Sequence, residues 1–165
     1  MKGLEESAED LQNLKAEGEE LLAELGVDGA DEDEGLPSVV ILEDDKVSSF
    51  MLVKLVKKMG LRVRNYENPL QALDEAKNFK VALLFLDMKL PEMNGLDFLV
   101  KLREVQKNPD IPVVVVTGYT QKSVVDKIIQ HNVKGILAKP LNMERAIKFI
   151  HALGNEAKID KAANA

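Results

Sequence analysis

The sequence predicts an α/β protein with a doubly wound, five-stranded parallel sheet. Short apolar runs alternate five times with stretches of helical period between residues 37 and 154, and only short connections separate them. Such alternation is typical of a parallel sheet whose helices cover both faces. The run at 81–86 is apolar at every position, as expected for a strand that is buried on both sides.

Charge is divided unevenly along the 165 residues of the chain. Residues 1–36 hold 13 acidic residues and two lysines, a net charge of −11, whereas the remainder carries +5. We therefore expect three parts: an acidic, helical N-terminal arm with its linker at 1–36, a globular domain at 37–154 and a C-terminal tail at 155–165.

The arm contains leucines that are spaced for one face of a helix between residues 4 and 25. Their spacing resembles a short, defective coiled-coil seam that Gly18 interrupts, and the acidic segment 28–35 is typical of a flexible linker. One interpretation is a solvated helix without a role. We favour a helix that binds a partner or docks on the basic domain, because self-pairing would bring many glutamates together. Cations for such docking are predicted on the first and third helices of the domain: Lys54, Lys57, Lys58, Lys101, Arg103 and Lys107.

The domain opens with an apolar run at 39–42, which predicts a first strand that ends at acidic residues. Apolar residues at helical period over 47–59 predict the first helix. Residues 61–66 alternate and predict the second strand. Asn68 followed by Pro69 marks the next helix start, since proline suits the first helical turn.

The second half of the domain repeats the same signs, with β-branched residues dominating its fourth apolar run. Turn residues such as Gly95, Gly118 and Pro140 separate the elements. Strands are predicted at 81–86, 111–116 and 135–138, and helices at 96–105, 121–131 and 142–153.

Polar side chains follow four of the predicted strands directly. Because parallel strands end at the same edge, these side chains are expected to lie together where open α/β sheets bind ligands. Asp87, taken alone, is equally compatible with a helix N-cap. The residues at this edge are Glu43, Asp44, Asp45, Asp87, Thr117 and Lys139.

This combination of groups predicts metal-assisted phosphoryl chemistry. Crowded carboxylates repel one another unless a cation neutralises them, and oxygen ligands favour Mg²⁺ or Mn²⁺. A lysine and a threonine suit the remaining phosphoryl oxygens, and an aspartate beside the metal can act as the nucleophile.

With this set of residues, the chain resembles the receiver domain of bacterial two-component response regulators over about residues 38–153. The resemblance implies the CheY-like, or flavodoxin-like, sheet and assigns 37–154 to a receiver domain. Each of its motifs is weak alone, but all of them occur in order and each at a strand end. They are Glu43-Asp44, the loop Asp87…Pro91…Gly95, Thr117-Gly118 and Lys139-Pro140.

The resemblance implies a role for each residue. Asp87 would accept the phosphoryl group and help to hold Mg²⁺. Asp44 would bind the ion directly, Glu43 through water and Lys89 through its main-chain carbonyl. Thr117 would bind a phosphoryl oxygen.

Lys139 would pair with the phosphoryl group, and its bond to Pro140 would be cis. The donor would be a histidine kinase or a histidine phosphotransfer protein, and phosphorylation would switch binding to a protein target that the sequence does not name. The domain would catalyse its own phosphorylation and dephosphorylation without being a turnover enzyme. A receiver-like interaction scaffold, or a receiver cut from a hybrid histidine kinase, is the alternative.

Two positions depart from the common receiver pattern. Ile136 and Leu141 stand where many receivers carry aromatic residues, which argues against the common aromatic switch. Tyr119 is expected near the mouth of the site, either shielding it or as a half-exposed loop residue. Asp45 is expected to cap the first helix.

Other function classes fit less well. A haloacid-dehalogenase-like phosphatase needs an acid two residues after its nucleophile, where this chain has Lys89. The acidic loop after the first strand would repel a nucleotide phosphate. The acidic arm disfavours nucleic acid, and no apolar run is long enough to enter a membrane. Without cysteine or a signal peptide, the chain is expected in the cytoplasm.

Overall fold

The computed structural model describes residues 36–153. The predicted helical arm, its linker and the tail lie outside the described residues. Within residues 36–153, no helix combines the length and the apolar character that crossing a membrane requires.

Five parallel strands form one sheet in the order β2-β1-β3-β4-β5, which confirms the predicted doubly wound fold. The strands are β1 (Pro37–Leu42), β2 (Val63–Tyr66), β3 (Lys80–Asp87), β4 (Val113–Thr117) and β5 (Gly135–Ala138). The helices are α2 (Lys46–Lys58), α3 (Pro69–Glu75), α4 (Gly95–Gln106), α5 (Lys122–Ile129) and α6 (Met143–Leu153).

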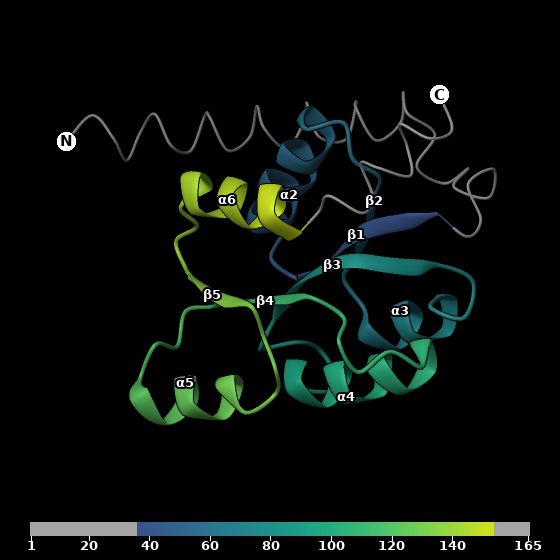
Figure 1. The fold of residues 1–165 in the computed structure, drawn as a ribbon. Helices are drawn as coiled ribbons and strands as arrows, with labels where there is room; N and C mark the ends of the chain where they lie inside the picture. The colour runs from purple at the N-terminus through teal and green to yellow at the C-terminus, as the bar shows by residue number, and fades with distance from the viewer. Residues whose placement is uncertain (1–35, 154–165) are drawn as a thin grey trace.

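The helices form a layer on each face of the sheet, with α2 and α6 on one side and α3, α4 and α5 on the other (Figure 1). Alternate side chains of β3 serve the two layers. Leu83 and Phe85 belong to the core under α2 and α6, whereas Leu84 and Leu86 belong to the core under the other three helices. All four are at most 1% exposed. This two-sided burial explains why the run at 81–86 has no polar residue.

Two helices begin where side-chain chemistry requires it. The side chain of Asp45 accepts hydrogen bonds from the backbone nitrogen (3.2 Å) and the hydroxyl (2.6 Å) of Ser48, which confirms the predicted cap of α2. Asn68 caps α3 through the backbone nitrogen of Leu70 (2.8 Å), and Pro69 occupies the first turn as predicted.

Two predicted strands begin two residues too early. The backbone nitrogen of Leu61 donates to the carbonyl of Val56 (3.2 Å), so Leu61 still belongs to the turn that ends α2. Pro112 has no N–H for the ladder, and β4 begins after it. Ile111 is nevertheless 1% exposed, which is why the apolar pattern extends further than the strand.

Long side chains tie the layer of α3, α4 and α5 together. Arg103 of α4 donates to the backbone carbonyls of Ile111 (3.1 Å), Asn132 (2.8 Å) and His131. The prediction that Arg103 is available for docking an acidic arm is therefore wrong.

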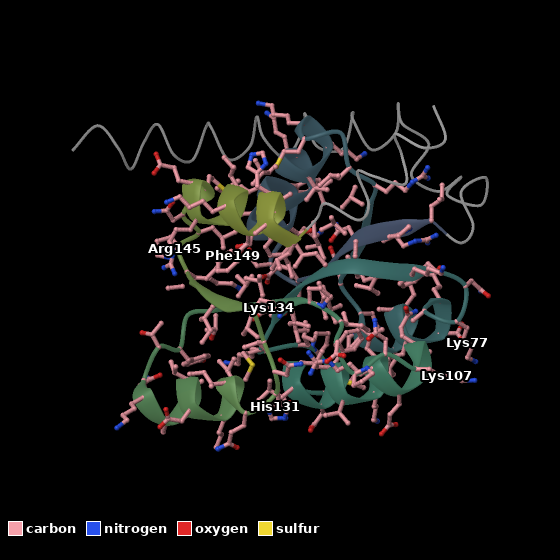
Figure 2. All side chains as sticks on the ribbon, in the orientation of Figure 1. Lys77, Lys107, His131, Lys134, Arg145 and Phe149 are labelled. Atoms are coloured by element: carbon pink, nitrogen blue, oxygen red, sulfur yellow. The ribbon has the colours of Figure 1, made fainter. Side chains whose placement is uncertain are left out.

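On the other face, Phe149 of α6 packs over Gly135, where an added Cβ would lie 2.2 Å from the ring (Figure 2).

Candidate functional site

Three carboxylates gather where β1 and β3 end. One oxygen each from Glu43, Asp44 and Asp87 lies within 4.8 Å of the others. β1 and β3 are neighbours in the sheet, and their register brings Glu43 beside Asp87. Glu43 is 1% exposed and Asp87 5% exposed, whereas Asp44 faces solvent. The predicted acidic cluster therefore has two buried members and one open member.

One cation compensates the buried pair. The Nζ atom of Lys139 lies 3.1 Å from Oε1 of Glu43 and 3.2 Å from Oδ2 of Asp87. Its backbone nitrogen donates to the carbonyl of Thr117 (2.9 Å), which fixes the end of β5 against β4. The side chain thus extends across β4 to the acidic cluster. The bond between Lys139 and Pro140 is cis, as the resemblance implied.

Thr117 lies at the end of β4, next to β3. Val116 pairs with Asp87 across the two strands, so Thr117 is one residue beyond the aspartate. The residue is 1% exposed, and its Oγ1 accepts a hydrogen bond from the backbone nitrogen of Tyr119 (3.0 Å). Because this oxygen accepts that hydrogen bond, its own proton can be donated to another group.

The loop after β3 turns tightly around Asp87. The backbone nitrogen of Lys89 donates to Oδ1 of Asp87 (3.1 Å), and that of Gly95 donates to the carbonyl of Met88 (2.9 Å). A Cβ on Gly95 would lie 2.4 Å from the carbonyl oxygen of Asp87, so this position accepts only glycine without a backbone shift. The sequence marked Gly95 as a turn residue but gave no sign of this contact.

Burial and crowding change how the carboxyl groups titrate. Burial, together with the neighbouring Asp87, raises the pKa of Glu43 to about 8. Partial burial and the charge of Asp87 also raise the pKa of Asp44. For Asp45, the hydrogen bonds from Ser48 and Val47 outweigh burial and lower the pKa. For Lys139, the contacts with Glu43 and Asp87 outweigh burial and raise the pKa.

The site opens into a cleft of about 520 Å³. Asp44, Asp87, Lys89, Tyr119 and Lys139 are among the residues that line it. The Nζ atom of Lys89 lies 3.2 Å from the hydroxyl of Tyr119 and 5.7 Å from the centre of its ring. Tyr119 is 45% exposed, so it is a lining residue that also faces solvent. The sequence suggested Tyr119 here but not its pairing with Lys89.

Ile136 and Leu141, which replace the common aromatic residues, are both half-buried. Ile136 packs against the core of α3, α4 and α5, and Leu141 against the core of α2 and α6. Neither lines the cleft at Asp87. Both therefore serve as apolar packing residues in this structure.

Comparisons with known proteins find receiver domains and response regulators of the same fold. The chain is 29% identical over 120 residues to the polar-differentiation response regulator DivK of Brucella anthropi, covering 73% of this chain and 98% of that protein. A response regulator structure from Burkholderia pseudomallei, with a phosphorylated aspartic acid, a calcium ion and citrate, is 26% identical with a TM-score of 0.60, covering 78% and 73% of the two chains.

The receiver domain of a sensor histidine kinase from Pseudomonas aeruginosa, with a magnesium ion in its active-site cleft, shares the fold. It is 18% identical, with a TM-score of 0.63, covering 72% of this chain and 97% of that one. The family model of the response regulator receiver domain matches residues 39–151, most of the described part. The chain therefore belongs to the response regulator receiver domain family.

Proposed function

We propose that this receiver domain accepts a phosphoryl group on Asp87 from the phosphohistidine of a histidine kinase or a histidine phosphotransfer protein. The observation that carries the proposal is the setting of Asp87. Its carboxylate is 5% exposed, bonded to Lys139 and to the backbone of Lys89, and yet it lines an open cleft. A carboxylate fixed in this way presents an oxygen to a phosphoryl group at low entropic cost.

In the proposed step, an oxygen of Asp87 attacks the phosphorus atom. The new P–O bond forms as the P–N bond to the donor imidazole breaks, and the leaving imidazole takes up a proton. Lys139, 3.2 Å from Asp87, would then compensate negative charge on the phosphoryl oxygens. The hydroxyl of Thr117 would donate to one of these oxygens.

The acidic cluster supports a divalent cation as cofactor. Three carboxylates face one lysine, and Oε2 of Glu43 is buried without a hydrogen-bond partner among the described residues. We infer that Asp44 and Asp87 hold Mg²⁺ directly, Glu43 through water and Lys89 through its carbonyl, with Mn²⁺ as a substitute. The bound ion would neutralise charge on the phosphoryl oxygens.

Phosphorylation would change the affinity of the domain for a protein target, and the domain itself would catalyse both gain and loss of the group. We propose that residues 37–154 form this unit in the cytoplasm, with the arm at 1–36 and the tail at 155–165 as separate parts. A receiver-like scaffold that never uses phosphate, or a receiver taken from a hybrid histidine kinase, remains the alternative.

Incubation with acetyl phosphate and Mg²⁺ tests the proposal. The protein should gain one phosphoryl group by intact mass, and Asp87→Asn should gain none. Asp45→Asn is the matched control, because it removes the same charge next to the cluster but touches the helix cap. Full labelling of Asp87→Asn would place the acceptor at another residue, and no labelling of the unmodified protein would favour the scaffold.

A further inference from the structure

The edge of the sheet opposite the candidate site is basic. The turns at 57–62, 76–80 and 130–134, which lead into β2, β3 and β5, contain six lysine or arginine residues and no acidic residue, and the turn at 107–112 into β4 adds one lysine and one aspartate. The carboxyl edge carries the acidic cluster instead, so the two edges have opposite charge. The six cations at the amino edge are Lys57, Lys58, Arg62, Lys77, Lys80 and Lys134.

The chain enters the sheet in the middle of this basic edge. β1 lies between β2 and β3. The backbone nitrogen of Val39 donates to the carbonyl of Arg62 (2.9 Å), and Pro37 pairs in register with Lys80. Residues that lead into Pro37 must therefore pass between a cation of the β2 turn and a cation of the β3 turn.

Lys57 has an ammonium group that no hydrogen-bond acceptor reaches in the described part of the chain. Its Nζ atom, in the last turn of α2, is shielded from water and has no hydrogen-bond partner within residues 36–153. Burial lowers the pKa of this ammonium group. A shielded, unpaired ammonium is unfavourable, so an acceptor from outside the described residues would stabilise it.

The other lysines of the edge are open. Lys58, Lys80 and Lys134 face solvent. Lys77 extends from the end of α3 on the right of the view, and its contact with Asp74 is long, at 3.9 Å, and largely exposed (Figure 2). Such a pair contributes little stability and leaves the lysine able to bind another carboxylate.

We propose that the acidic segment of this chain at residues 28–34 binds the amino edge of the sheet. The segment contains five Asp or Glu residues in seven positions and ends three residues before Pro37. Nine residues of extended chain span about 30 Å, so the tether permits contact with either edge. Charge selects the amino edge, because the carboxyl edge would add five carboxylates to an existing cluster of three.

This docking leaves the cleft at Asp87 open. It also directs the predicted arm helix away from the carboxyl edge, so that a partner bound by the arm and a phosphoryl donor at the cleft would not compete for space. The acidic segment of a second copy is the competing occupant of the amino edge, and mixing labelled with unlabelled protein separates the two cases.

Paramagnetic relaxation in the full chain tests the proposal. The sequence has no cysteine, so Ala30→Cys places one nitroxide label within the segment and keeps all of its charges. At low salt, the amide signals of Lys57 and Lys80 should be strongly broadened, and those around Asp87 should not. About 23 Å separates the two ends of an eight-residue strand such as β3, so the two edges are distinguishable.

Two variants of the labelled chain provide the comparison. Replacing Asp31, Glu32, Asp33 and Glu34 by their amides should reduce the relaxation effect at Lys57 severalfold while the tether stays the same. Replacing Glu5, Glu6, Glu9 and Asp10 by their amides, the matched control, should leave it unchanged. On the surface side, Lys57→Gln with Lys80→Gln should reduce the effect, and Lys101→Gln on the outer face of α4 should not.

Three results would overturn the proposal. The first is broadening at Lys57 that neither amide replacement nor 0.5 M salt, where the Debye length is only about 4 Å, reduces. The second is broadening centred on Asp87. The third is broadening that appears when spin-labelled protein is mixed with isotope-labelled, spin-free protein, which would assign the contact to a second copy.

Discussion

Asp44→Ala should stabilise the protein without Mg²⁺ and make it less stable than the unmodified protein when Mg²⁺ is added. Asp44 faces solvent, and one of its oxygens lies within 4.8 Å of oxygens of Glu43 and Asp87. At that distance two like charges repel by about 1 kcal/mol in water and about 3 kcal/mol at an effective dielectric constant of 20. Because Asp44 is exposed and Lys139 offsets part of the repulsion, we expect the lower figure.

Without divalent cations, the variant should therefore have a free energy of unfolding about 1 kcal/mol higher than that of the unmodified protein. For a domain of this size, that corresponds to a melting temperature about 4 °C higher. With Mg²⁺ at a hundred times its dissociation constant, the unmodified protein gains about 2.7 kcal/mol by mass action. The variant, having lost a direct ligand, should gain little and become the less stable of the two.

The assay is thermal unfolding in EDTA and in a series of Mg²⁺ concentrations. Asp45→Ala is the matched control, since it removes the neighbouring carboxylate but also the cap of α2. That variant should lose about 1 kcal/mol in both conditions and keep the full response to Mg²⁺. If Asp44→Ala responds to Mg²⁺ like the unmodified protein, or is destabilised in EDTA, the assignment of Asp44 as a metal ligand is wrong.

Three further predictions concern the same site and the domain boundary. Glu43 has a pKa raised from 4.5 to about 8, so the folded state binds one proton more than the unfolded state between these pH values. In EDTA, the free energy of unfolding measured by urea titration should therefore fall as the pH rises from about 5 to 8. Glu43→Gln should flatten that dependence on pH. Gly95→Ala should cost about 1–3 kcal/mol by denaturant unfolding and slow labelling by acetyl phosphate, because its Cβ would displace the backbone of Asp87; an unchanged midpoint would show that the loop yields freely. Deletion of residues 1–36 should leave a cooperatively folded domain that acetyl phosphate still labels, since every predicted site residue lies beyond it; loss of folding would place the arm in the core.

The arrangement of the sheet could be predicted because local pattern and global fold agree. The apolar run at 81–86 is buried on both faces, and the glycine and alanine that bound 135–138 are the ends of β5. The grouping of polar residues at one edge of the sheet could also be predicted from their positions after the strands, because parallel strands end at the same edge. Prediction was wrong at positions 61 and 111, where buried residues outside the strands extend the apolar pattern.

The contacts made by long side chains could not be predicted from the sequence. Arg103 was expected to face an acidic arm, but three backbone carbonyls from other segments bind its guanidinium. The shared pairing of Lys139 with Glu43 and Asp87 depends on the spacing of three strands, and so does the pKa of Glu43. Such contacts join residues far apart in the chain and leave no periodic sign in it.

The phosphoryl acceptor can be identified directly by chemical trapping. Borohydride reduces an aspartyl phosphate to homoserine, so the protein is treated with acetyl phosphate and Mg²⁺, reduced and analysed as peptides by mass spectrometry. Our account predicts homoserine at position 87, formed only when Mg²⁺ is present. Homoserine at Asp44, Asp45 or any other position, with residue 87 intact, would contradict it.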